Sequence, residues 1–491
     1  MPTTPEVTLK AGALRGRWES EVAVFRGIPY AAPPVGANRF AAPQPAGGWD
    51  GVRPATAFGP SAPQAGETTG DDWLTVNVWS PDPGPAAGLP VLVWIHGGAY
   101  TIGKSSSPEY DGGHLARDGH VVLVTFNYRL GMEGFAHLAG APDNRGLLDQ
   151  VAALEWVRDN IAAFGGDPAK VTVFGESAGG GSVAALLAMP RAAGLFRGAI
   201  AQSVPGTFFS RELAAEIAAA CAAEVGLDAT VTDLAEVDPA LLALAGDAVM
   251  AAAAKRTERW GPAAYRSVLL APVVDGEVLP ATPWQALRAG AAREVALLAG
   301  HTRDEQRLFT AFGDPATPEE AATALDLLAP APDGARRYRV AYPDAAPDRL
   351  HELVHSDWLF RMPSVHLADA QLAGGGRAHF YELTWPAPGM GGIFGACHGL
   401  DVPLVFGNLT AGQPALLIGD DPGSDALELS AWMRAAWTAF AADGDPGWPA
   451  YTPDRQLTQI FDVPGAVAAY PEHRSHLIWH GHSFAPLTPR D

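Results

Sequence analysis

The chain has 491 residues, and 48% of them are hydrophobic, so it can bury a large core and is not expected to be intrinsically disordered. Its 33 lysines and arginines and 54 acidic residues give a formal net charge of -21 at pH 7. That charge argues against nucleic acid and anionic membrane surfaces as partners, because both would repel the protein.

The composition also bears on the compartment. Cys221 and Cys397 are the only cysteines, too few for a disulfide framework. Residues 1–18 contain no apolar run of the kind that a signal peptide needs. The longest uncharged run, residues 83–103, is interrupted by prolines and a glycine pair, so we do not expect a membrane-spanning helix there. These features predict a cytoplasmic protein that does not associate with membranes.

The first eighty residues alternate short β-like runs with glycine and proline. Residues 7–9 and 21–28 are predicted to form a small N-terminal antiparallel sheet. Residues 71–79 alternate between polar and apolar side chains, which favours a strand at a sheet edge with one face on the core.

Two buried strands and an amphipathic helix come next. Residues 89–95 and 121–126 are apolar and β-branched, as in the central strands of a parallel sheet. Apolar residues then recur at helical spacing over residues 147–161, with Asp149 on the polar face, and Gly165 ends the helix. A further strand follows at once, so strand, helix and strand repeat, which indicates a doubly wound parallel sheet.

This further strand, residues 171–174, leads into a serine flanked by glycines. The sequence Gly175-Glu176-Ser177-Ala178-Gly179 fits the pattern G-x-S-x-G, and a predicted helix follows it. Strand, serine and helix in this order form the context of a nucleophile elbow, in which flanking glycines avoid a clash where strand and helix cross. The helix N-terminus would point backbone N–H groups at the space before the hydroxyl. The pattern alone also fits an ordinary tight turn, so the partners of the serine must decide.

The remaining chain continues the alternation of strands and helices. Strands are predicted at residues 198–203, 295–300 and 378–385. Helical segments are predicted at 211–260, 310–375 and 427–442. Because no internal repeat or linker separates these segments, we expect residues 1–491 to form a single domain.

A glycine-rich loop ends the predicted strand at residues 89–95. Its sequence is His96-Gly97-Gly98-Ala99-Tyr100. Glycines directly after a buried strand allow a ligand to approach the backbone closely. The loop is similar to the oxyanion-hole motif of esterases, although an ordinary glycine-rich turn fits its residues equally well.

Seven segments, in order along nearly the whole chain, resemble the type-B carboxylesterases, the family that includes cholinesterase-like enzymes and bacterial p-nitrobenzyl esterases. The segments are residues 25–30, 72–78, 94–100, 127–131, 165–168, 174–179 and 397–403. The resemblance implies an α/β fold of the α/β-hydrolase type. Its large, mostly parallel central sheet would carry helices on both faces, beside a small N-terminal antiparallel sheet.

The resemblance also implies the roles of individual residues. It identifies Ser177 as the nucleophile, Glu305 as the acid and His398 as the base of a catalytic triad. Their order along the chain is that of α/β-hydrolases. The implied function is that of a serine carboxylesterase, which hydrolyses a small-molecule ester through an acyl-enzyme intermediate without a cofactor or a metal.

An oxyanion hole would complete this site. The resemblance assigns its donors to the backbone N–H groups of Gly98, Ala99 and Ala178. Such donors stabilise the charge that develops on the ester oxygen, and the loss of one typically costs about 10²–10³ in rate. A loop with Ala99 in place of a third glycine remains compatible with donation from the backbone.

Asp304 directly precedes Glu305, and from the residues alone either carboxylate could serve as the acid. Neighbours on an extended segment point to opposite sides, so only one of them should reach His398. The family match favours Glu305. Asp304 is then expected to be a surface or salt-bridged carboxylate, and its replacement by asparagine should cost much less activity than a change of Glu305.

Other polar residues near these motifs have simpler interpretations. His96 is expected to order the glycine-rich loop, and Glu176 to hold a water molecule or the histidine loop. The pair His480 and His482 could bind a metal, but two ligands near a chain end make a poor site.

The sequence departs from the family pattern at Trp73, where many members carry a cysteine that forms a disulfide. The loop that this disulfide would hold, residues 55–70, is therefore expected to be shorter or more mobile. Candidate walls of the substrate pocket are five aromatic residues: Phe208, Phe209, Trp358, Phe360 and Phe394.

Two alternative functions remain. A catalytically inactive adhesion or binding member of the same fold would lack the serine or the histidine, and this chain has all three triad candidates. An interfacial lipase would need a large apolar lid, which we do not identify in the sequence. Within the esterase function, a specialisation for carbamates or amides is also open, and the oligomeric state is not predicted.

Overall fold

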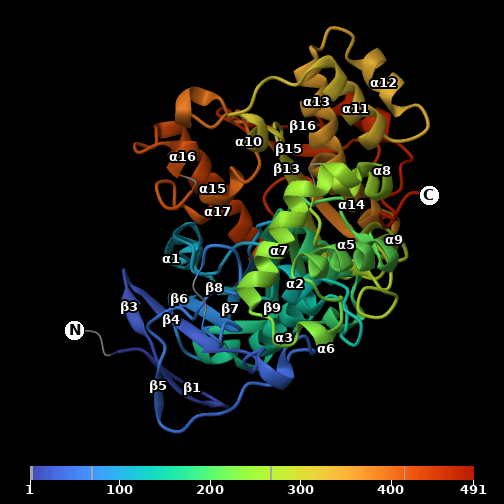
Figure 1. The fold of residues 1–491 in the computed structure, drawn as a ribbon. Helices are drawn as coiled ribbons and strands as arrows, with labels where there is room; N and C mark the ends of the chain where they lie inside the picture. The colour runs from blue at the N-terminus through green and yellow to red at the C-terminus, as the bar shows by residue number, and fades with distance from the viewer. Residues whose placement is uncertain (1–3, 68–69, 266–267, 414) are drawn as a thin grey trace.

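The computed structural model describes residues 4–67, 70–265, 268–413 and 415–491. An 11-stranded sheet extends across this structure (Figure 1). Neighbouring strands from β15 to β8 pair in parallel, and the strands at both edges pair antiparallel. In spatial order the strands are β16 (Ala466–Ala469), β15 (Leu457–Phe461), β14 (Arg377–Leu383), β13 (Ala296–Thr302), β10 (Gly198–Gln202), β9 (Gly166–Glu176), β7 (Leu89–Ile95), β8 (Val122–Phe126), β6 (Thr75–Ser80), β4 (Val22–Pro29) and β3 (Arg17–Glu19).

Alternate residues of the central strands build two separate cores. Val91, Val93 and Ile95 of β7 belong to one cluster of buried side chains, whereas Leu92 and Trp94 belong to the other. Because successive side chains of a strand point to opposite faces, an unbroken apolar run needs cover on both sides.

Helices supply this cover on each face. The first cluster contains buried residues of α3 (Arg145–Asn160), α4 (Ala178–Ala188), α9 (Pro283–Arg288) and α14 (Met362–Ala373). The second contains residues of α1 (Gly113–Gly119), α15 (Asp401–Phe406) and α17 (Ser424–Asp443). The predicted mostly parallel sheet with helices on both faces is therefore confirmed.

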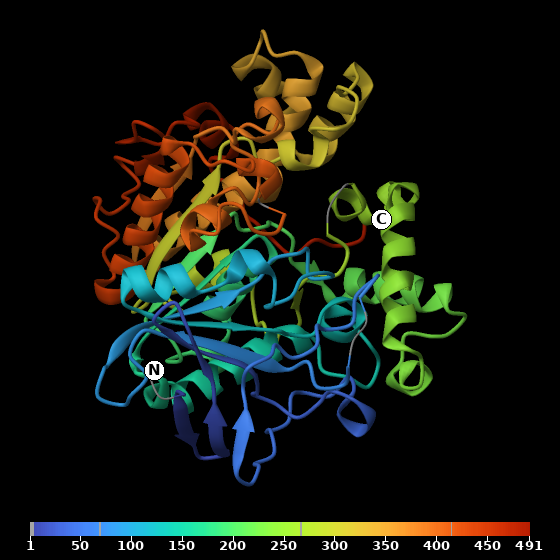
Figure 2. The same cartoon turned by 90° about the vertical axis from the view of Figure 1, so that its left-hand side faces the viewer.

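Further helices lie outside these layers. The helices α11 (Pro318–Leu328), α12 (Gly334–Ala341) and α13 (Pro347–Ser356) form a lobe at the end of the molecule opposite the N-terminal strands (Figures 1 and 2). Figure 2 shows α7 (Pro239–Ala252) on one side of the molecule and α15 to α17 on the other. Within the described residues no helix is long and apolar enough to cross a membrane.

The N-terminal region differs from the prediction in its pairing. The small sheet consists of β1 (Glu6–Leu9), β2 (Gly12–Arg15) and β5 (Val52–Pro54), and β5 joins it in parallel. Residues 22–29 do not belong to it, because β4 pairs with β6 in the large sheet.

The predicted edge position of residues 71–79 is wrong. β6 lies between β8 and β4, and all its residues are buried. Its central polar side chain has partners inside the protein: Asn77 Nδ2 donates to Ser105 Oγ at 3.1 Å and to Thr125 Oγ1 at 3.0 Å, whereas the buried hydroxyls of Thr75 and Ser80 make no hydrogen bond with the described residues. Polar alternation therefore marks a buried hydrogen-bond network here and not a solvent-exposed face.

Candidate active site

Ser177 occupies a strained turn between β9 and α4. β9 ends at Glu176, α4 begins at Ala178, and Ser177 has φ 58° and ψ -124°. Such a conformation is costly for a residue with a side chain and persists only where the surroundings enforce it. An added Cβ at Gly179 would lie 2.0 Å from the carbonyl oxygen of Ile95, so the crossing of strand and helix requires glycine. This is the geometry expected of a nucleophile elbow.

The glycine-rich loop after β7 lies directly against this turn. An added Cβ at Gly97 would lie 2.8 Å from the carbonyl oxygen of Glu176 and 3.2 Å from Ser177 Cβ. Gly98 and Ala99 have positive φ angles of 108° and 54°, so the backbone turns sharply at this point. The tight turn and the close approach explain the glycines.

Three backbone N–H groups at this turn have no acceptor among the described residues. Those of Gly98 and Ala99 donate no hydrogen bond within the part of the chain that the structure describes. Ala178 is the first residue of α4, where an N–H has no acceptor within the helix. The three donors named from the sequence are thus free to bind an oxyanion.

His398 and Glu305 are in direct contact. His398 Nδ1 lies 2.6 Å from Glu305 Oε2. The other oxygen, Oε1, accepts hydrogen bonds from Ser203 Oγ at 2.7 Å and from the backbone N–H of Thr302 at 2.9 Å. Burial alone would raise the pKa of Glu305, but the histidine and these donors hold it below its ordinary value. Glu305 is therefore an ionised, rigidly held partner for the imidazole.

The opposite edge of the His398 ring faces the elbow. Nε2 lies 3.1 Å from Glu176 Oε1, although the geometry makes no hydrogen bond. Burial lowers the pKa of His398, but the charges of Glu176 and Glu305 raise it to about 9. Phe360 stacks on the ring with centroids 4.1 Å apart, and Phe309, which is 58% exposed, lies 5.5 Å away. The two glutamates thus lie at the two nitrogen atoms of the ring, and Phe360 and Phe309 pack near it.

The structure separates the roles of Asp304 and Glu305. Only Glu305 reaches the imidazole, as expected, but the reason given from sequence was wrong, because residues 303–306 form a turn and not an extended segment. Asp304 is salt-bridged to Arg303 at 3.0 Å and is 2% exposed, so it is not a surface residue.

The remaining histidine candidates have no catalytic contact. His96 stacks on Tyr128 at 4.5 Å, its Nδ1 lies 2.8 Å from the carbonyl oxygen of Gly97, and burial lowers its pKa to about 4. It orders the glycine-rich loop, as predicted. Among the described residues no group of three or more histidine, cysteine, aspartate and glutamate side chains could hold a metal ion, and the pair at His480 and His482 is no exception.

Of the aromatic residues expected to line a pocket, Phe360 contacts the candidate base, whereas Phe208 packs against Trp284 at 5.5 Å in the core. Sequence reasoning missed Ser203 and Phe309. Ser203 directly follows β10, beside the elbow strand, and the carboxyl ends of parallel strands are where site residues gather. That signal could have indicated it.

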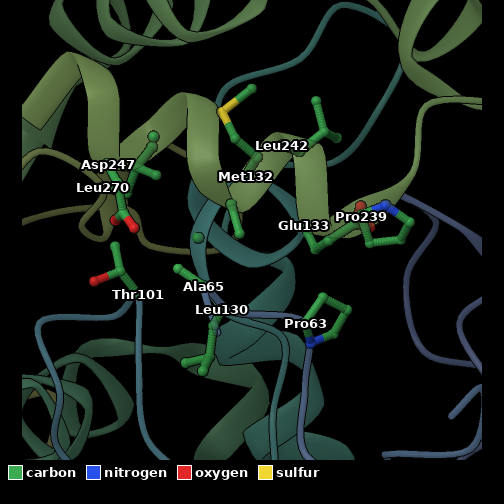
Figure 3. A pocket seen from close by; sticks show the side chains of 13 residues that line it. Pro63, Ala65, Thr101, Leu130, Met132, Glu133, Pro239, Leu242, Asp247 and Leu270 are labelled. Atoms are coloured by element: carbon green, nitrogen blue, oxygen red, sulfur yellow. The ribbon is translucent and has the colours of Figure 1, made fainter. Parts of the chain in front are cut away.

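A pocket lies beside Thr101, Met132 and Leu242 (Figure 3). Thr101, which follows the glycine-rich loop, lines it together with Leu130, Met132, Leu242 of α7 and Leu270. Glu133 and Asp247 line it as well, so the pocket combines apolar and acidic side chains.

The loop expected to be shorter or more mobile, residues 55–70, is partly described, since residues 68 and 69 lie outside the described residues. Gln64 exchanges two 2.9 Å hydrogen bonds with the backbone of Gly103, and Glu67 forms a 2.5 Å ion pair with Lys104. These contacts tie the loop to the segment after the glycine-rich loop, and Trp73 is buried.

Comparison with known proteins identifies relatives of the whole chain. A model of a family described as the carboxylesterase family matches residues 3–463. A para-nitrobenzyl esterase of Bacillus subtilis is 39% identical, over 95% of this chain and 96% of the relative, and human carboxylesterase 3 is 33% identical, over 94% and 88%. A solved PNB esterase structure is similar with a TM-score of 0.86 and 38% identity, over 97% of this chain and 99% of that one. A carboxylesterase of Geobacillus stearothermophilus has a TM-score of 0.85, 37% identity and coverages of 96% and 99%.

Proposed function

Because this chain belongs to the carboxylesterase family and is a carboxylic ester hydrolase, we propose that it cleaves small-molecule esters with a triad of Ser177, His398 and Glu305. The observation that carries the proposal is the 2.6 Å contact between His398 Nδ1 and Glu305 Oε2, together with the 3.1 Å approach of His398 Nε2 to Glu176, which precedes Ser177 in its strained elbow. A carboxylate in this position fixes the tautomer of the base and stabilises the imidazolium that forms during the reaction.

In the first half of the reaction His398 Nε2 removes the proton of the Ser177 hydroxyl as the oxygen attacks the ester carbonyl. The tetrahedral intermediate places its negative oxygen at the N–H groups of Gly98, Ala99 and Ala178. Collapse of this intermediate breaks the ester bond, and the imidazolium returns its proton to the leaving alcohol. Ser177 then carries the acyl group.

In the second half water attacks the acyl-enzyme. His398 takes a proton from the water, the same three N–H groups bind the second oxyanion, and Ser177 leaves with the proton that the histidine returns. The products are a carboxylic acid and an alcohol. Since a relative at 39% identity is named a para-nitrobenzyl esterase, p-nitrobenzyl and p-nitrophenyl esters are the first substrates to test.

Covalent labelling tests the nucleophile. We expect an organophosphate or a sulfonyl fluoride to stop hydrolysis and to leave its adduct on Ser177, as peptide mass spectrometry will read. Ser177→Ala should neither react nor hydrolyse esters at a measurable rate. An adduct on Ser203 with Ser177 unmodified, or wild-type turnover in Ser177→Ala, would refute the assignment. Turnover in the wild type would also exclude an inactive binding protein.

A further inference from the structure

The loop that carries His398 docks onto residues 304 and 305. The backbone N–H of Asp304 donates to the carbonyl oxygen of Ala396 at 2.8 Å. In return the N–H of Ala396 donates to Asp304 Oδ2 at 3.1 Å. The N–H of His398 reaches the carbonyl oxygen of Glu305 at 3.4 Å. Asp304 therefore holds both polar groups of Ala396, two residues before the candidate base.

Arginines surround the Asp304 carboxylate. Arg303 contacts Oδ2 at 3.0 Å, and the guanidinium groups of Arg307 and Arg349 each approach to 3.7 Å. Burial raises the pKa of Asp304, but Arg303, Arg307 and the N–H of Ala396 lower it below its ordinary value. Glu352 lies on the other side of the cluster and pairs with Arg307 at 3.0 Å and with Arg349 at 2.7 Å. Asp304 is thus an ionised acceptor in a fixed position.

The loop is pressed tightly onto this cluster. Gly395 has a φ angle of 57°, and an added Cβ would lie 2.7 Å from Asp304 Oδ2 and 2.5 Å from Arg307 Nη1. The N–H of Ala387 donates to the carbonyl oxygen of Gly395 at 2.8 Å. No side chain fits between the loop backbone and the carboxylate, so a shift of Asp304 has to move the loop.

We propose that Asp304 is a positioning residue for the ester hydrolysis and that it acts together with the adjacent Glu305. Glu305 holds the imidazole of His398, and Asp304 holds the backbone that carries it. The proposal rests on the proposed function of His398 as the base. A displacement of about 1 Å in a catalytic group can cost about 10²-fold in rate, which makes such a clamp effective. It adds a positioning role to Asp304, which was expected from the sequence to be a surface or salt-bridged carboxylate.

Two substitutions separate positioning from general stability. Asp304→Ala removes the acceptor for Ala396 and should lower kcat about 10–10²-fold with little change in KM. Asp304→Asn keeps an oxygen that can accept the same hydrogen bond but loses the charge that the arginines hold in place, so it should lower kcat measurably, although less than Asp304→Ala. If Asp304→Ala does not fold, Asp304→Asn is the variant that tests the proposal. The low-field proton NMR signal of the His398 imidazole N–H bonded to Glu305 should shift or broaden in both variants.

Glu352→Gln is the matched control. It breaks ion pairs with the same arginines but touches no atom of the histidine loop, so kcat should stay within about two-fold of wild type. Wild-type kcat with an unchanged low-field signal in Asp304→Ala or Asp304→Asn would overturn the proposal, as would an equal loss in Glu352→Gln. Ser177→Ala keeps the two questions apart: turnover in that variant contradicts the proposed function, whereas an inactive Ser177→Ala beside a fully active Asp304→Ala contradicts only the positioning role.

Discussion

At the residue scale, Glu176 lies between the elbow that carries Ser177 and the imidazole of His398. It precedes Ser177 in the chain, its Oε1 lies 3.1 Å from His398 Nε2, and it is buried. Burial is the main reason that its own pKa rises to about 8, and His398 opposes this rise. When it is ionised, Glu176 stabilises the imidazolium, and its carboxylate lies at the edge of the ring that accepts the serine proton in the proposed reaction. Glu176 and Glu305 therefore both raise the pKa of His398, the candidate base.

Glu176→Gln should change the pH dependence of the reaction. The base acts only as neutral imidazole, so activity is lost as the pH falls through its pKa. Glu176 raises that pKa, so its neutral replacement should move the acidic limb of the kcat/KM profile to lower pH. The measurement is kcat/KM for a p-nitrophenyl ester between mildly acidic and basic pH.

The exposed Glu155 offers a control for this experiment. Glu155→Gln removes the same charge from the surface of α3 and should leave the acidic limb in place. An acidic limb that does not move in Glu176→Gln would mean that the carboxylate is uncharged, or directed away from the ring, in the working enzyme.

At the element scale, α3 shows how a helix can bury a charge. Asp149 was expected on its polar face, but the structure buries it completely against Arg129, which follows β8. Arg129 Nη2 donates to Oδ1 at 2.7 Å, and its Nε and backbone N–H donate to Oδ2 at 2.8 and 3.0 Å. A further donor of Arg129, Nη1, reaches the carbonyl oxygen of Ala41 at 2.7 Å. One ion pair thus connects the helix, the end of a central strand and the N-terminal region.

Asp149→Asn should destabilise the protein strongly. It leaves the guanidinium of Arg129 buried without its counter-charge, which typically costs about 3–5 kcal/mol. Guanidinium chloride unfolding followed by tryptophan fluorescence should show the loss as a lower midpoint. Asp159→Asn on the same helix breaks an exposed pair with Arg158 and should shift the midpoint little, because exposed pairs contribute about 0–1 kcal/mol. Equal midpoints for the two variants would contradict this account.

At the scale of the whole molecule, one sheet connects distant parts of the chain. β3 and β4 near the N-terminus and β15 and β16 near the C-terminus extend the same sheet at its two edges. The two hydrophobic clusters on its faces combine helices from the first and the second half of the sequence. Neither half can therefore complete its core alone.

This arrangement favours one cooperative unit, and the single domain over residues 1–491 stays a prediction. We expect differential scanning calorimetry to show one unfolding transition, with loss of esterase activity in the same temperature range. Two resolved transitions, or activity lost well before the main heat absorption, would indicate separate domains. Adding a thiol reductant should not change the result, because Cys221 and Cys397 are buried free thiols.

Much of the fold follows from local patterns. The apolar runs that became β7, β8, β9 and β13, and the helices α3 and α4, are determined by residues close together in the chain. The elbow around Ser177 belongs to the same group, since the clash at Gly179 arises wherever a strand turns directly into a crossing helix. Because periodicity and turn geometry act over a few residues, the sequence alone determined these elements, and the resemblance to a family proposed His398 and Glu305 as partners of the serine.

Contacts between distant residues were decided only by the tertiary structure. The bond between Ser203 and Glu305 spans 102 residues, and that between His398 and Glu305 spans 93. The burial of Asn77 in β6 and of Asp149 in α3, and the clamp of Asp304 on Ala396, likewise depend on partners that no local pattern specifies. A polar side chain has the same local sequence whether it meets water or a partner. Its environment is set when the helices pack on the sheet. A buried polar group is stable only where this packing supplies a hydrogen bond or an opposite charge.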